Sequence, residues 1–429
     1  MAKKFIKSNQ MLKKVSKDIP LASQTFSKSY LQYVGGVSPL FVERAKGSYI
    51  WDVDGNEYID MICALLPIIL GYQYKKIDDA IRSQLKKGII FSLPSPLEYE
   101  LAQLLIKHIP CAQMVRFGKN GSDATTGAVR LARACTGREH IAACGYHGWH
   151  DWYIGSTTRN LGVPKSTQKL THKFKYNNIE SLEKIFKQNK GKVSAVIMEP
   201  MNYIEPEKGF LESVKKVAHK NGALLIFDEV VTGFRWSLGG AQKYFNVTPD
   251  LAAFGKSMAN GMPISALVGK RKYMKKVDDI FYSFTQGGEA LSISAAIATI
   301  KEIEQKKVIE YIWKLGEYLK QETQKIISKN ELDGIIKIQG KPCWHILSFS
   351  NTKKYSDLEI KSYLQQEIIQ KGFLWYAQHN ISFSHTKKDI DELLQAYENI
   401  FPKLKKHIKS GALKKSIKGK PITNIFKVR

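Results

Sequence analysis

The chain has few cysteines, and they form no metal-binding or disulfide pattern. Its 429 residues include five cysteines, an odd number, and no two of them are spaced as C-x-x-C. Such a set does not suit a disulfide framework or a zinc site built on cysteine pairs. We therefore expect reduced thiols and a cytoplasmic protein with no bound metal.

Long apolar runs are also missing. No stretch approaches the roughly 20 residues that a membrane-spanning helix needs, and the basic N-terminus lacks the apolar centre of a secretory signal. With 43% hydrophobic and 11% aromatic residues, the chain can still bury a large core. We expect a globular protein of two or three lobes that does not associate with a membrane.

Arginine is scarce, although the formal net charge is +27. Only ten of the 66 basic residues are arginine, and the lysines are spread along the whole chain. Proteins that read nucleic acids rely on the bidentate arginine fork, so nucleic-acid binding is kept only as a remote alternative. The densest lysine cluster, "KLKKHIKSGALKKSIKGK", is interpreted as a solvated basic tail.

Short apolar runs alternate with helical patterns from about Pro96 onward. Three of these runs, "KVSAVIMEP", "GALLIFDEV" and "PDLAAFGK", end close to Glu199, Asp228 and Lys256. Alternation of this kind indicates a largely parallel, doubly wound α/β sheet. Ligands of such sheets bind outside the carboxyl ends of the strands, which makes these three residues candidates for a site.

The pattern divides the chain into three parts. Residues 1–85 form an N-terminal segment with a helical arm and a hairpin at Asp54-Gly55 in "YIWDVDGNEYIDM". Residues 86–305 form the large α/β domain, and residues 306–429 a smaller α+β domain with the basic tail. In this last part, Thr386 and Asp389 predict a helical capping box, and Pro402 is expected to stop or kink the helix.

A turn of small residues opens the helix in "GKNGSDATTGAVRLARACTG". Gly121 allows the backbone to approach a ligand closely, Ser122 offers a hydroxyl, and the helix N-terminus favours a phosphate. An ordinary N-cap is the alternative. Because Asp123 would repel a phosphate, we expect its carboxylate to turn away and cap the helix.

The segment "CGYHGWHDW" gathers aromatic residues and histidines after a strand. Tyr146 could cover the face of a flat ring. His147 and His150 are three residues apart, a spacing that could bind zinc. No further zinc ligands lie at suitable spacing nearby. This segment is therefore assigned to binding a flat ligand.

Asp228 and Lys256 complete the candidate site. A buried acid needs a partner, and a cationic ring nitrogen is one, while Val230 could pack beneath the ring. The amine of Lys256 could condense with an aldehyde if burial lowers its pKa; the alternative is a surface lysine. A phosphate seat, an aromatic cover, a pyridinium-pairing acid and a Schiff-base lysine together specify pyridoxal 5′-phosphate.

Several motifs resemble those of the class III aminotransferases of fold type I, especially the group that contains glutamate-1-semialdehyde 2,1-aminomutase. They include "GGVSPLFVERAKGSYIWDVDGNEYID", "AVRLARACTGRE", "GYHGWHD", "FDEVVTGFR", "LGGAQKYFNVTPDL" and "GKSMANGMP". The resemblance covers about residues 34–300, and more weakly residues up to about 400. It implies an aspartate aminotransferase-like fold with a seven-stranded type of sheet.

The resemblance also implies roles for individual residues. Lys256 would hold the cofactor as an internal aldimine and later remove the α-proton of the substrate, and Asp228 would pair with the pyridine nitrogen. The remaining assignments are phosphate binding by Gly121 and Ser122, ring contacts by Tyr146 and Val230, and positions near the cofactor for His147 and Glu199. Thr285 would reach the phosphate in the neighbouring subunit, which implies a homodimer with its sites at the interface. Arg235 is interpreted as architectural.

The sequence departs from the aminomutase where that enzyme binds its substrate. The aminomutase motif "GGVNSPVR" carries an arginine suited to a carboxylate, whereas this chain has "GGVSPLFVER", and Leu65 stands at about the position of an aminomutase tryptophan. We therefore expect a transaminase that moves an amino group from an amino acid, with glutamate as the expected donor. The acceptor would be a small ketone or aldehyde, phosphorylated or glycan-related. The aminomutase reaction remains the alternative.

Overall fold

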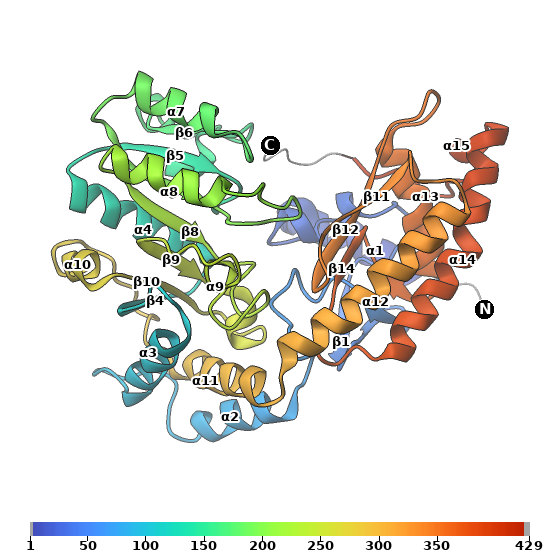
Figure 1. Ribbon diagram of the computed structural model, residues 1–429. Coiled ribbons are helices and arrows are strands. Elements are labelled where there is room, and N and C mark those ends of the chain that lie inside the picture. Colours follow the sequence, from blue (N-terminus) through green and yellow to red (C-terminus); the bar gives the residue numbers. More distant parts are fainter. Residues whose placement is uncertain (1–2, 424–429) are drawn as a thin grey trace. The chain divides into compact units, whose positions relative to one another are not determined.

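The computed structural model describes residues 3–423, which divide into two compact units (Figure 1). The first unit joins the N-terminal segment up to Tyr74 with the chain from Glu310 onward. The second unit is Lys75–Ile309. Helix α2 (Lys75–Leu85) falls in the second unit.

The second unit is built on a seven-stranded sheet with the order β4-β10-β9-β8-β7-β5-β6. Strand β10 pairs antiparallel with both β4 and β9, and the other neighbours are parallel. The predicted, largely parallel sheet is therefore confirmed. Its strands are β4 (Met114–Gly118), β5 (His140–Cys144), β6 (Thr171–Lys173), β7 (Val193–Met198), β8 (Leu224–Asp228), β9 (Leu251–Phe254) and β10 (Ser265–Gly269).

The central strands are apolar because both faces of the sheet are covered. Every residue of β7, β8, β9 and β10 is buried, as is usual for parallel sheets. Helix α4 (Gly121–Thr136) packs across this sheet (Figure 1). Its buried positions include Ala124, Ala128 and Ala132, whose small side chains let the helix lie close to the strands. The other helices of eight or more residues are α3 (Pro96–His108), α7 (Ile179–Gln188), α8 (Phe210–Lys220) and α11 (Ala290–Gln305).

The first unit contains two smaller sheets. One has the order β1-β2-β3-β13 and the other β11-β12-β14. The predicted hairpin at Asp54-Gly55 is confirmed, since it joins β2 to β3 with Gly55 at φ +84°. The strands are β1 (Val42–Lys46), β2 (Tyr49–Asp52), β3 (Glu57–Asp60), β11 (Ile336–Lys341), β12 (Trp344–Phe349), β13 (Phe373–Leu374) and β14 (Gln378–Asn380).

Four long helices complete the first unit: α1 (Ile6–Asp18), α12 (Val308–Lys329), α13 (Asp357–Gln370) and α14 (Lys387–Ser410). The capping box of Thr386 and Asp389 is confirmed at the start of α14. The expectation that Pro402 stops this helix is wrong, because α14 runs on to Ser410. Pro402 and Glu398, whose carbonyl loses its helical partner, are both exposed, so water can satisfy the carbonyl.

The basic stretch that follows is folded as far as the structure describes it. Gly411 ends α14, and α15 (Leu413–Ser416) follows. Leu413 and Ile422 are buried, so this stretch packs against its unit instead of extending into solvent. The last six residues of the chain, beyond the basic cluster that ends at Lys420, lie outside the described residues. Within residues 3–423, no helix has the length and apolarity needed to cross a bilayer.

Candidate active site

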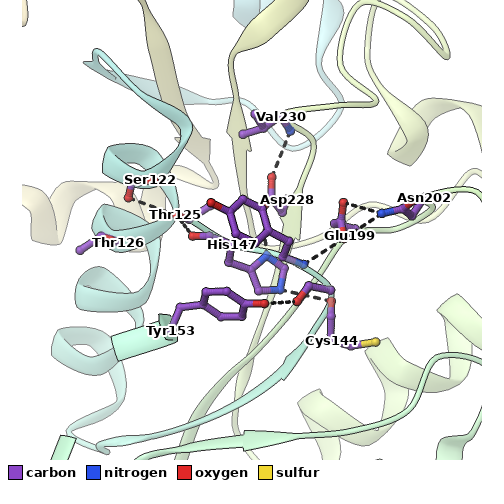
Figure 2. Close-up of polar contacts among 12 residues, drawn as sticks. Ser122, Thr125, Thr126, Cys144, His147, Tyr153, Glu199, Asn202, Asp228 and Val230 are labelled. Atoms are coloured by element: carbon purple, nitrogen blue, oxygen red, sulfur yellow. Dashed lines mark hydrogen bonds and ion pairs between the residues drawn. The ribbon is translucent and has the colours of Figure 1, made fainter. Parts of the chain in front are cut away.

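The candidate residues come together at the carboxyl edge of the large sheet. Asp228 is the last residue of β8, Glu199 follows β7, and Lys256 lies two residues beyond β9. Strands β7, β8 and β9 are parallel neighbours, so their ends meet at one edge. Figure 2 shows the polar contacts around Asp228 and Glu199.

Asp228 is paired with His147 from the loop after β5. The Asp228 Oδ2 atom lies 2.9 Å from Nδ1 of His147, and its Oδ1 atom accepts the backbone N–H of Val230 at 3.1 Å. The other ring nitrogen of His147, Nε2, lies 3.2 Å from the carbonyl oxygen of Cys144. The His147 side chain is fully buried beside Asp228.

The partners of His147 hold its ring in place. Both ring nitrogens face oxygen atoms, and the backbone carbonyl among them can only accept a hydrogen bond. The contact at Nδ1 orients the carboxylate of Asp228.

Glu199 is held by the loop that carries Tyr146. Its Oε2 atom accepts the backbone N–H of Tyr146 at 3.0 Å, and the side-chain amide of Asn202 donates to Oε1 at 3.1 Å. Tyr146 is 44% exposed and meets Tyr153 edge to face at 5.7 Å. Burial raises the pKa of the Tyr146 phenol, with smaller contributions from Asp228 and Glu199. Tyr146 thus presents its aromatic ring, with a hydroxyl that stays protonated, at the edge of the site.

The phosphate seat is predicted at the N-terminus of α4. The expected cap is confirmed, because the Asp123 carboxylate accepts the backbone N–H groups of Lys119 and Asn120 at 2.9 and 2.7 Å. The backbone N–H groups of Gly121 and Ser122 donate to no other described residue. Two donors therefore remain at the positive end of a 16-residue helix.

Val230 contacts the same turn of α4. Strand β8 ends at Asp228, and Val230 lies in the turn that follows it. Its side chain reaches α4, since a Cβ added to Gly121 would lie 2.9 Å from Val230 Cγ1. Only glycine fits at position 121 without a shift of its neighbour.

Lys256 is partly exposed and has a left-handed backbone conformation, with φ at +40°. Burial lowers the pKa of its amine; the charges of Asp228 and Glu199 oppose this shift, and that of Arg235 adds to it. Arg235 is fully buried and donates from Nη2 to the hydroxyl of Ser257 at 3.5 Å. A lysine in this setting loses its proton more readily than a surface lysine.

Thr285 lies apart from these contacts. It is exposed in the loop before α11, and its hydroxyl has no hydrogen-bond partner among the described residues. With Glu98, Arg116 and Gly288 it lines a cavity of about 650 Å³ on the second unit.

Three supporting residues were missed by sequence reasoning. Asn202 binds Glu199, the Tyr153 hydroxyl donates to the carbonyl of Gly145 at 2.6 Å, and the Thr125 hydroxyl donates to the carbonyl of His147 at 2.9 Å. Figure 2 shows all three around the loop after β5. Asn202 follows Glu199 by three residues, which is a weak signal, and no local pattern indicates the other two.

Comparisons with known proteins agree with this geometry. Residues 32–400 match the family model described as aminotransferase class-III. A 3-aminobutyryl-CoA aminotransferase from Cloacimonas acidaminovorans is 36% identical, covering 94% of this chain and 98% of the relative. A glutamate-1-semialdehyde 2,1-aminomutase from Desulforamulus reducens is 35% identical, with coverages of 94% and 99%. A structure of the PLP internal aldimine form of the FumI protein from Sphingopyxis sp. MTA144 superposes with a TM-score of 0.88 at 28% identity, covering 94% and 98%.

The sheet and its edge site define a pyridoxal-phosphate-dependent transferase of fold type I. The chain belongs to the class III aminotransferase family and is an enzyme of that class. Its residues fit the cofactor: the α4 N-terminus has two N–H groups without protein partners, and the glycine at 121 admits no Cβ. The carboxylate of Asp228, which His147 orients, suits a protonated ring nitrogen.

Proposed function

We propose that this enzyme is an aminotransferase that uses Lys256 as its reactive amine. The observation that carries the proposal is the position of this lysine, two residues beyond β9 at the sheet edge that holds Asp228 and Glu199. The lowered pKa of its amine supports the same role, because a neutral amine is the reactive form in imine chemistry.

Each side chain of the site has a separate proposed role. Pyridoxal phosphate, when bound, supplies an electron-accepting ring that stabilises negative charge on the substrate carbon. Asp228 would hold a proton on the ring nitrogen, and His147 keeps the Asp228 carboxylate oriented. The amine of Lys256 takes the proton from the substrate carbon and returns a proton later. Gly121 and Ser122 bind the phosphate through their N–H groups, and Tyr146 and Val230 orient the ring.

Transamination is favoured over the aminomutase reaction by one contact in the first unit. The stretch "GGVSPLFVER" contains a single arginine, Arg44, and its guanidinium stacks on Trp51 with the carbon atom 3.7 Å from the ring centroid. An arginine held on an indole is not directed at a substrate carboxylate. We therefore propose an amino acid donor, glutamate first, and a small ketone or aldehyde acceptor without carboxylate recognition of the aminomutase kind. Phosphorylated and glycan-related acceptors should be among the first compounds tested as amino acceptors.

The test is a donor and acceptor screen on purified holoenzyme. We expect glutamate to convert the bound cofactor to its amine form, seen by absorbance, with release of one equivalent of 2-oxoglutarate. The panel should include 3-aminobutyryl-CoA and glutamate-1-semialdehyde. Isomerisation of the semialdehyde without an external donor would favour the aminomutase.

Replacement of the lysine tests the assignment itself. The variant K256A should lose turnover by at least about 10³-fold, and borohydride should no longer attach the cofactor to the peptide around position 256. The control K270A removes a lysine that is engaged with Asp250 instead and should keep its turnover. Full activity in K256A would exclude this mechanism.

We also propose that the enzyme is a homodimer in which Thr285 acts on the partner's site. Thr285 is exposed and lacks a hydrogen-bond partner among the described residues. Exposed apolar side chains lie on the same unit, at Ile89, Ile90, Phe91, Leu93, Tyr99 and Phe281. Apolar surface of this kind is typical of a protein interface. Gel filtration with light scattering should give twice the chain mass of 48.6 kDa.

A further inference from the structure

The first unit contains a cavity of about 370 Å³ whose lining belongs entirely to that unit. This volume is in the range of sites for small organic ligands. Most of the lining is apolar, as with Leu40, Phe41, Ile62 and Leu374, and aromatic rings complete it. The walls come from the segment 22–45, the strands β2 and β3, the turn after β3, and the end of β13.

Two tyrosines bring unused hydrogen-bond donors to this cavity. Tyr33 and Tyr376 both line it, and their rings meet edge to face at 6.4 Å. Tyr376 is only 8% exposed. Neither hydroxyl bonds to another described residue, yet neither oxygen is sealed off from solvent. These two oxygens are therefore available to form hydrogen bonds with a molecule bound in the cavity.

The charges near the cavity decide what kind of molecule fits. Asp60 lines the wall, and its carboxylate accepts the Tyr72 hydroxyl at 2.6 Å and the backbone N–H of Ile62 at 2.8 Å. Burial, together with the charge of Asp60, raises the pKa of the Tyr33 and Tyr376 phenols. Both phenols therefore stay protonated and act as donors. An ionised Asp60 would repel a carboxylate in the cavity, although burial raises the pKa of the Asp60 carboxyl.

Cations offer little compensation for an anionic ligand. Lys28 is the one cationic side chain among the lining residues, and it is exposed at the rim. Lys361 lies 5.5 Å from the ring centroid of Tyr376 but is not among the residues that line the cavity. The interior thus combines apolar walls with two donors and one buried acidic side chain.

The backbone around the cavity is strained in a way that suits a ligand site. Ala22, Ala64 and Leu65 line it with φ values of +49°, +53° and +74°. Cys63–Leu66 is a run of four non-glycine residues that all have positive φ. Such conformations cost of order 1–3 kcal/mol each and concentrate at functional sites.

We propose that this cavity binds an uncharged, largely apolar molecule or substrate portion whose oxygen accepts hydrogen bonds from Tyr33 and Tyr376. A ketone, ester or ether oxygen meets the requirement, and a carboxylate does not. The proposal concerns ligand binding alone, so it stands or falls separately from the amino-transfer reaction proposed above.

A set of three probes of nearly equal shape tests the chemistry on wild-type holoenzyme. Acetophenone offers a neutral acceptor, ethylbenzene offers none, and benzoate is an anion. Binding is measured by saturation-transfer NMR titration in the absence of an amino donor, so that no reaction occurs. We expect acetophenone to bind about tenfold more tightly than ethylbenzene, and benzoate to bind most weakly. Equal affinity for acetophenone and ethylbenzene, or tighter binding of benzoate, would overturn the proposal.

Variants connect the probes to the cavity. The double variant Y33F/Y376F keeps both rings and removes both donors, so its acetophenone affinity should fall about tenfold, to that of ethylbenzene. The matched control is Y244F, which makes the same change on the second unit, away from the cavity, and should bind acetophenone normally. L40W fills the cavity and should weaken acetophenone and ethylbenzene alike. An unchanged acetophenone affinity in Y33F/Y376F would contradict the proposal even if L40W failed to fold.

Competition kinetics then distinguish two sources of the ligand. If the cavity accepts part of the substrate, acetophenone raises the KM for the amino acceptor, and Y33F/Y376F changes that KM more than kcat. If a separate ligand binds there, acetophenone binds with the same affinity and leaves the KM unchanged. A preparation that binds acetophenone as expected but transfers no amino group would refute the proposed reaction and leave the cavity assignment intact.

Discussion

The carboxylate of Asp228 lies 2.9 Å from Nδ1 of His147, and the same imidazole reaches the carbonyl oxygen of Cys144 from Nε2 at 3.2 Å. This pair links the end of β8 to the end of β5 through a fully buried ring. A ring held between these two oxygens fixes the orientation of the Asp228 carboxylate. We expect the chemistry of the site to depend on this contact.

Replacement of His147 by glutamine tests this dependence. H147Q removes the imidazole that orients Asp228 but keeps a donor, so we expect kcat/KM to fall about 10- to 100-fold, as for other residues that orient a functional ligand. The absorbance of the bound cofactor should also change with pH at lower values than in wild type, because a misplaced Asp228 would hold the proton of the ring nitrogen less firmly. The control H150Q alters a histidine of the same loop whose Nδ1 contacts Thr126 at 2.7 Å, and should stay within about threefold. A cofactor spectrum identical to wild type in H147Q would refute the role.

Gly148 should be essential for the phosphate seat. It has φ +100°, and an added Cβ would lie 2.2 Å from the hydroxyl of Ser122. G148A must therefore displace Ser122, and we expect the dissociation constant of pyridoxal phosphate to rise at least about tenfold. The matched control is G137A, which has φ +66° but nothing within 4 Å of the added Cβ. It should cost only about 1–2 kcal/mol of stability through backbone strain and leave cofactor affinity unchanged. Fluorescence titration of the apoenzymes measures both constants.

Asp250 should stabilise the second unit in a pH-dependent manner. Its carboxylate is buried and binds the Lys270 amine at 2.7 Å, the His219 ring at 2.7 Å and the backbone N–H of Leu225 at 2.9 Å. Burial acts to raise its pKa, but these hydrogen bonds outweigh burial and lower it. The unfolded carboxyl titrates near pH 3.9, so the stabilisation is complete above that pH and is lost as the pH falls through the lower folded value.

The variant D250N makes this measurable. At pH 7 it should reduce the free energy of unfolding by roughly 2–3 kcal/mol, and the difference from wild type should shrink below about pH 4. The control E322Q breaks the exposed pair of Glu322 with Lys325 and should change stability by at most about 0.5 kcal/mol. Urea denaturation at pH 7 and pH 3.5 gives both differences. A loss in D250N that is equally large at both pH values would contradict the linkage.

Much of the site could be predicted because chain order determines strand ends in a parallel sheet. Glu199, Asp228 and Lys256 each follow an apolar run, and the carboxyl ends of neighbouring parallel strands meet at one edge. Asp123 was recognised as a cap because a carboxylate at an anion site has few other stable positions. These inferences needed only local patterns and the direction of the strands.

The sequence could not indicate features that tertiary packing decides. The pairing of His147 with Asp228 depends on how its loop folds back over β5 and β8, which no local pattern encodes. The continuation of α14 past Pro402 depends on an exposed carbonyl and on the buried face that resumes at Leu404. The cavity of the first unit is formed by segments more than 300 residues apart, from Tyr33 to Tyr376, and the sequence alone gave no reason to bring them together.

The proposed action of Thr285 across the interface can be tested by mixing two impaired variants. K256A lacks the reactive amine, and T285A lacks the hydroxyl proposed to bind the phosphate of the partner's cofactor. In a mixed dimer, one site combines an intact Lys256 from the T285A chain with an intact Thr285 from the K256A chain. That site is complete, whereas each parent dimer contains only incomplete sites.

We therefore expect T285A alone to bind the cofactor several-fold more weakly than wild type. Mixing T285A with K256A after mild denaturation should give mixed dimers in which one of the two sites is complete. Turnover at limiting cofactor concentration measures the recovery, because the affinity difference is visible only there. Mixing K256A with wild type provides the control for subunit exchange. If Thr285 served its own subunit, the mixed dimer would have no complete site, and turnover would not exceed that of T285A diluted by the same amount.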